Sequence, residues 1–161
     1  MPAPNITAST RYTSRGTARY YWVVTIANYL APSSGELNAG TDLSPEVMDL
    51  SGFGLESDQI DTPDVSNRFT KKIPGPINAD DSTLTMYPSV LGTDARQLMP
   101  QDTAGYVVIF PGGNTTGRKM HVWPVRVASV KYVYSASGSD PDTMVFTFSP
   151  TNVPAENVTV P

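Results

Sequence analysis

Hydrophobic and polar residues alternate along several short segments of the chain, as in β-strands that bury one face. The clearest case is Thr143–Ser149, where Met144, Phe146 and Phe148 share one face. Arg19–Ala27 is apolar on both faces, which indicates that both are covered. Period-2 patterning and turn spacing predict strands at residues 19–27, 47–58, 67–73, 82–88, 105–110, 120–134 and 143–149.

The longest of these segments, residues 120–134, changes its phase. Val125 and Val127 point one way, whereas Val130 and Tyr132 continue the apolar pattern one position out of step. A slip of one residue moves every following side chain to the other face, so we expect a bulge or sharp bend at residues 128–129. Pro124 suits an edge-like start of this strand.

Helical signals are few. Thr93 or Asp94 can cap a short helix over Ala95–Met99, which Pro100 ends, and Ser33–Leu37 favours one further turn. The 15 prolines and 12 glycines separate short segments, which favours β-structure over helices. We therefore predict an all-β fold: an antiparallel β-sandwich or barrel of two packed sheets, with one short α-helix and a long inter-strand loop or hairpin at Asp61–Gly75. Residues 1–10 are expected to be an extended N-terminal arm, and residues 11–161 one domain.

The composition excludes several kinds of catalytic chemistry. The chain has no cysteine, which excludes disulfides, thiolate metal sites and cysteine nucleophiles. Its single histidine, His121, lies beside Trp123 in a strand pattern, where a structural role is the ordinary interpretation. The sequence has neither a secretory signal nor an apolar run of the roughly 18 residues needed to span a bilayer, so we expect a soluble protein made in a cytoplasm.

The remaining motif fragments are weak. Asp80-Asp81 precedes a strand and is typical of a turn rather than a metal site. Gly52-Phe53-Gly54 lacks the third glycine of a dinucleotide-binding loop, and Gly112–Gly117 lacks the ending of a phosphate-binding loop. Glu56 and Asp58 lie about 7 Å apart on one strand face, a spacing that glycosidases use, but acids are common on sheet surfaces. We predict no enzyme, no catalytic residue, no metal ligand and no cofactor.

Charge is distributed unevenly along the chain, whose net charge is −4. Tyr20–Asn67 contains eight acidic residues and no lysine or arginine, and basic residues flank it on both sides. The pattern fits simple solubility, and it also fits head-to-tail self-assembly, in which an acidic surface meets a basic one on a second copy. For assembly, the candidate contacts join bases and acids of adjacent copies: Arg68, Lys71 and Lys72 with Asp61 and Asp64.

The segment from Ser51 to Tyr87 combines three motifs in a fixed order. They are the turn IDTPD, the basic return RFTKKIPG and the strand DSTLTMY, and the pieces RYYWVVTIA, GTDL and PAENVTVP lie outside it. In order and spacing, this chain resembles the major tail tube proteins of long-tailed phages of the siphophage type, especially those of actinobacteria. The resemblance covers residues 11–161.

The resemblance implies a structural virion protein in hexameric rings that stack into the hollow phage tail. The inner sheets of the subunits would join into one β-barrel around a channel. A tape measure protein would fill the lumen during assembly, tail terminator and baseplate proteins would bind the tube ends, and double-stranded DNA would pass through without specific binding. Assembly in the host bacterial cytoplasm is also implied.

A channel for DNA should avoid lysine and arginine, because these side chains bind phosphates. The long base-free part of the chain therefore suggests lumen-facing candidates: Glu46, Asp49, Glu56 and Asp58, completed by Thr83 and Thr85. Two alternatives are a capsid decoration protein and a lectin-like or receptor-binding β-sandwich module. Trp22 and Trp123 lie within strand patterns, which favours a core role over exposed lectin aromatics. The Asp61–Gly75 excursion favours the tube over the decoration protein.

Overall fold

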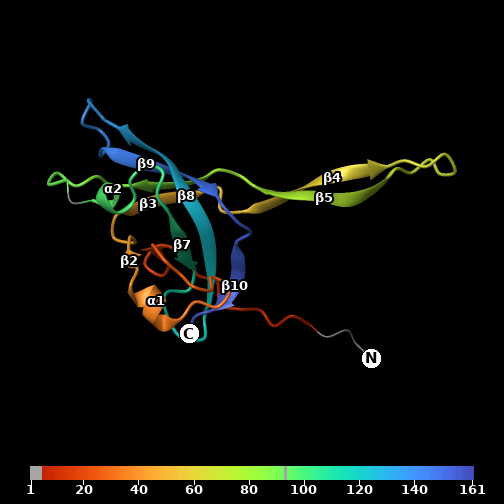
Figure 1. Cartoon of the computed structure of the whole chain (residues 1–161), viewed down its shortest axis with the longest axis horizontal. Coiled ribbons are helices and arrows are strands. Elements are labelled where there is room, and N and C mark those ends of the chain that lie inside the picture. The colour runs from red at the N-terminus through yellow and green to blue at the C-terminus, as the bar shows by residue number, and fades with distance from the viewer. Residues whose placement is uncertain (1–4, 93) are drawn as a thin grey trace.

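The computed structural model describes residues 5–92 and 94–161 and is almost entirely β-structure (Figure 1). In chain order its elements are β1 (Arg19–Val23), α1 (Ser34–Asn38), β2 (Thr41–Asp42), β3 (Val47–Ser51), β4 (Leu55–Thr62), β5 (Lys71–Ala79), β6 (Ser82–Met86), α2 (Ala95–Leu98), β7 (Ala104–Phe110), β8 (Lys119–Val133), β9 (Thr143–Pro150) and β10 (Ala155–Thr159). All strand pairs are antiparallel. The predicted all-β antiparallel fold is confirmed.

The body is one strongly bent sheet. Its strand order is β2-β1-β7-β8-β9-β6-β3, with β10 also paired to β8. The first part of β8 pairs with β7 and the last part with β9, and the register slips between Val127 and Ser129. The predicted bulge is therefore confirmed. The two sheets expected from the sequence are two halves of a single sheet that share β8, the long curved strand in Figure 1.

Pro124 lies inside β8 and not at its start. The strand pairs with β10 at Val122 and with β9 from Val125 onward, so proline occupies the position where the partner changes. The carbonyl of Pro124 accepts a hydrogen bond from the N–H of Thr151 at 3.0 Å. The predicted edge-like start is wrong in position. Proline, which has no backbone N–H, instead lies where β8 changes its partner from β10 to β9.

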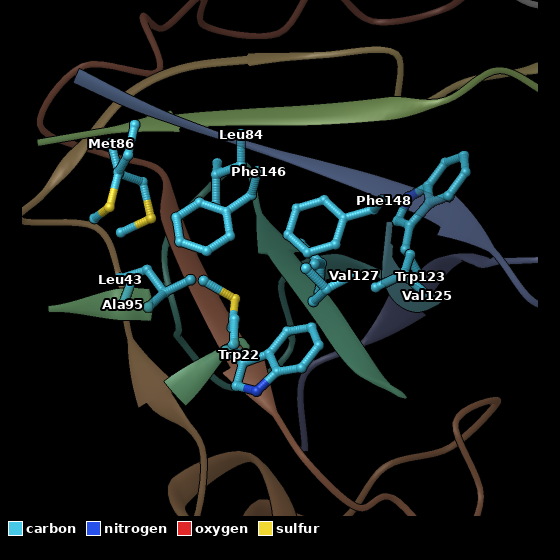
Figure 2. Packing of buried hydrophobic residues seen from close by; sticks show 13 residues of the cluster. Trp22, Leu43, Leu84, Met86, Ala95, Trp123, Val125, Val127, Phe146 and Phe148 are labelled. Atoms are coloured by element: carbon cyan, nitrogen blue, oxygen red, sulfur yellow. The ribbon is translucent and has the colours of Figure 1, made fainter. Parts of the chain in front are cut away.

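The main core fills the space between the two halves of the sheet (Figure 2). Leu84, Phe146 and Phe148 from β6 and β9 face Trp22 of β1 and Val127 of β8. The Trp22 and Phe148 rings stack with centroids 6.1 Å apart. Burial of these large side chains, each worth roughly 1.5–3 kcal/mol, holds the halves together.

A second core lies on the opposite face of β1, β7 and β8. Val23, Val108 and Val122 pack there with Leu37 of α1 and Ala155 of β10. This confirms that β1 is covered on both faces. Trp22 and Trp123 are each 1% exposed, so the core role inferred from their strand patterns is also confirmed.

Strand boundaries differ from the prediction mainly around the hairpin. Residues 47–58 form two strands, because Gly52 adopts φ 78° and interrupts them. The strand expected at 67–73 is β5, which begins at Lys71 and continues through Pro74 and Pro76. Two prolines are tolerated because this two-stranded hairpin has only edge strands. The strand expected at 19–27 stops at Val23.

Helix α2 begins after the predicted cap Asp94, and α1 begins after Ser33, which caps it. The Asp94 carboxylate accepts the N–H of Arg96 at 3.1 Å, whereas Thr93 lies outside the described residues. At α1, Ser33 and Glu36 form a capping box, and the Glu36 carboxylate accepts N–H groups from Ser33 and Ala27 at 2.8 and 2.7 Å. These hydrogen bonds lower the pKa of Glu36. The acid thus joins α1 to the chain that leaves β1.

Residues 5–10 form neither helix nor strand and are exposed. The N-terminal arm over residues 1–10 and the domain boundary at residue 11 stay predictions. Within the described part of the chain, no helix is long and apolar enough to cross a membrane.

Gly105→Ala should destabilise the fold, because the added Cβ would clash with Cζ2 of the buried Trp22 ring. Overpacking of this kind costs about 1–3 kcal/mol. Urea unfolding should show a lower midpoint with an unchanged slope. Gly54→Ala is the matched control, since its Cβ would meet nothing within 4 Å. Equal midpoints for the two variants would contradict the packing argument.

Candidate assembly surfaces and channel face

A long hairpin projects from the body on one side (Figure 1). We call residues 55–79, which form β4, β5 and the connecting tip, the hairpin arm. Its strands pair only with each other, in a separate two-stranded sheet. An isolated two-stranded hairpin is marginally stable in water. The arm therefore has the form of an element that gains stability by contacting another molecule.

One face of the arm carries an exposed apolar pair. Ile60 and Ile73 are cross-strand partners on this face and are 47% and 49% exposed, whereas Ile77 pairs with Ser57 beyond a register shift and lies on the other face. The adjacent pair, Gln59 and Pro74, points to the opposite side. We call the first side the isoleucine face. An exposed apolar pair on a projecting element indicates a protein contact.

The five inter-subunit candidates all lie on the arm. However, four of them pair within one copy: Lys72 Nζ lies 3.3 Å from Asp61 and Lys71 Nζ 3.9 Å from Asp64. Both pairs are exposed, so each contributes at most about 1 kcal/mol. Arg68 lies in the tip and forms no salt bridge with any described residue. Of the candidate bases, Arg68 is the one without an acidic partner in its own copy.

A polar face covers the outer side of the sheet half formed by β3, β6, β9 and the end of β8. Two rows of directly opposed residues cross these strands. One row is Asp49, Thr85, Val145 and Lys131; the next is Ser51, Thr83, Thr147 and Ser129. We call these two rows the channel face. Small hydroxyl side chains dominate it, and its two charges lie at opposite edges.

The four lumen candidates are not brought together. Asp49 lies on the channel face, with Thr83 and Thr85 as expected. Glu46 precedes β3 and lines a groove with Leu43 and Leu98, whereas Glu56 and Asp58 lie on the hairpin arm. The sequence reasoning overlooked the contribution of β9 and β8. The outward positions of their period-2 patterns would have revealed it.

Local charges around the channel face are few. Arg126, next to the bulge, is paired with Asp102 at 3.1 Å. Burial raises the pKa of Tyr20, and the negative charge of Asp49 raises it further. Lys131 forms no salt bridge among the described residues.

Both edges of this sheet half are open in the described structure. β3 pairs with β6 alone, and β8 beyond Val127 pairs with β9 alone. An open edge presents unpaired N–H and C=O groups and is a template for another strand. Two open edges on one four-stranded unit allow identical units to join side by side.

The described residues contain no group of three or more His, Cys, Asp or Glu residues that could hold a metal ion. Nδ1 of His121 accepts the N–H of Asn157 at 3.4 Å. Asp80 and Asp81 form the short connection from β5 to β6.

Comparisons with known proteins agree with this architecture. A search of curated protein sequences found no match. Among solved structures, a sheath/tube terminator of an extracellular contractile injection system is similar, with TM-score 0.65 and 12% identity over 90% of this chain and 96% of that chain. The sheath-tube complex of that system gives TM-score 0.60 with 12% identity, covering 87% and 88% of the two chains. A chain of the anti-feeding prophage baseplate gives TM-score 0.54 with 11% identity, covering 94% and 95%.

At such low identity these likenesses show a shared fold. The family assignment comes from sequence: the model of a family described as phage tail tube protein matches residues 6–161. The chain therefore belongs to the phage tail tube protein family and is a structural tail protein, not an enzyme.

Proposed function

We propose that this chain is the major tail tube subunit, which polymerises into stacked hexameric rings around a channel that delivers genomic DNA into the bacterial host. The observation that carries the proposal is the channel face. Six copies placed side by side would turn six such faces toward one axis. Their threonines and serines would offer DNA a polar wall with little net charge, so that phosphates would not be held during transit.

The strand directions support closure of such a ring. β3, β6, β9 and β8 alternate in direction, so an even number of strands separates the two open edges. Side-by-side copies related by rotation would therefore meet through antiparallel edges. Closing a sheet into a barrel removes every open edge.

The hairpin arm supports stacking of rings. It projects beyond the body and presents its isoleucine face and Arg68 to the surroundings. A contact between the arm of one copy and a different surface of a copy in the next ring is heterologous, and such contacts generate open-ended filaments. Asp61, Asp64, Lys71 and Lys72 would help to position the arm, in part through their pairs within it.

The remaining partners follow from this role. We propose that a tape measure protein occupies the lumen during assembly, and that terminator and baseplate proteins bind the two tube ends. Asp49 is the acid that we propose faces the lumen. Glu46, Glu56 and Asp58 stay sequence-based predictions, and their positions outside the channel face give them no support. The mature location is the virion tail, after assembly in the bacterial cytoplasm.

Electron microscopy of the purified chain, concentrated at neutral pH, tests the proposal. We expect tubes with a central hole, and six-fold symmetry in end-on views. A chain that stays monomeric at all concentrations, or one that forms closed particles without a channel, would contradict the proposal. The virion provides a second sample in which the same chain should be the main component of isolated tails.

A further inference from the structure

The two charges of the channel face lie at the two edges that meet between neighbouring subunits. Asp49 is on β3, at one open edge, and Lys131 is on β8, at the other. Through Thr85 and Val145 they belong to a single row of directly opposed residues. Both side chains are exposed, and neither is in a salt bridge with any described residue.

We propose that Lys131 of one copy forms an ion pair with Asp49 of the next copy, and that this pair sets the register of the seam between subunits in the ring. The inference rests on the proposed ring. It adds the residues that join adjacent copies and the alignment of the two strands.

The sheet geometry allows only a few registers. Side chains alternate along a strand, so a shift of one residue would turn β3 or β8 inside out, and only shifts by two keep the channel face intact. Among the allowed registers, one places Lys131 opposite Asp49. Shifts by two place Lys131 opposite Ser51 or another uncharged residue of β3 and leave its ammonium unpaired toward the channel.

The charges favour the first register. Opposite charges on directly opposed strand residues contribute a favourable free energy, and like charges are unfavourable by a similar amount. This contribution is small for one seam, but each ring would contain as many seams as subunits. The pair would also neutralise the base that the channel face carries, leaving the wall without a free positive charge. Specificity of register is a role that interfacial charges commonly have.

Cysteine cross-linking tests the seam directly, because the chain contains no cysteine of its own. Disulfides need Cβ atoms about 3.5–4.5 Å apart, and directly opposed strand residues come close to this range, at about 4.5–5.5 Å and less in non-hydrogen-bonded pairs. In assembled tubes of Asp49→Cys/Lys131→Cys, mild oxidation should give covalent oligomers up to the size of one ring and no larger. The control is Asp49→Cys/Ser149→Cys, because Ser149 is exposed but lies on β9, away from the edge.

Exchange of the two charges provides the second test and does not depend on a disulfide. Asp49→Lys and Lys131→Asp should each reduce the yield of tubes, because each brings like charges together at every seam. The double variant should recover most of the yield. If the cysteine variant assembles poorly, this recovery alone decides.

The outcomes separate the inference from the proposed function. Tubes that form but give no cross-linked rings, or a double variant no better than the single variants, would overturn the seam pair and leave the tube intact. Failure of the unmodified chain to form rings or tubes would reject the proposed function itself.

Discussion

Replacing Ile60 and Ile73 with aspartate should abolish tube formation and leave the monomer folded. The two side chains are the cross-strand partners that form the isoleucine face, and each is about half exposed in the single chain. Fully burying an isoleucine contributes roughly 1.5–3 kcal/mol. The double variant removes most of that gain from every contact between rings and adds two charges that would have to be buried.

Electron microscopy and sedimentation should show the loss of tubes, while circular dichroism and thermal unfolding of the body stay unchanged, because the arm pairs with no strand of the main sheet. The control is Gln59→Asp/Pro74→Asp. It alters the neighbouring cross-strand pair on the opposite face and introduces the same charge. Tubes formed equally by both variants would show that the isoleucine face is not the contact.

Sequence patterns predicted the body of the fold because burial imposes a strict period on it. Met144, Phe146 and Phe148 of β9 alternate with less buried residues because one face packs in the main core. The bulge after Val127 was predictable for the same reason: the apolar set changes parity where the strand changes partner. Such positions are constrained within a single chain.

The hairpin arm was predicted less well. Residues 71–79 contain two prolines and a glycine and have no buried face, so local pattern gives little indication of a strand. The arm forms because β4 and β5 pair with each other, and only its base, at Leu55 and Ala79, packs against the main core. β2 was missed because it has only two residues. β10 was missed because its pairing with β8 is irregular and contains a register shift.

The candidate site residues show a similar division. Asp49, Thr83 and Thr85 were expected to line one surface, and register places them on a single face. Glu56 and Asp58 were grouped with Asp49 because no basic residue separates them in sequence, but Gly52 turns the chain between them into a different sheet. Charge runs in sequence do not reveal such a turn, whereas strand register does.

Lysine on the channel face should block passage of DNA while the tube still assembles. Thr85 and Thr147 lie on β6 and β9, the two central strands, and both are only partly buried, so Thr85→Lys/Thr147→Lys changes no residue of the edge strands or of the core. Repetition around a ring would surround the DNA with lysines. The affinity of a protein that contacts 6–10 phosphates falls by roughly 10³–10⁵ when the salt concentration rises from 50 to 200 mM. DNA held this way should leave slowly at low salt and faster as salt rises.

The measurement is the rate of DNA release from phage particles carrying the variant, with Thr85→Glu/Thr147→Glu as a control of similar bulk. Equal release rates for the two variants, at every salt concentration, would place this face away from the DNA and remove the main support for its role as the channel wall.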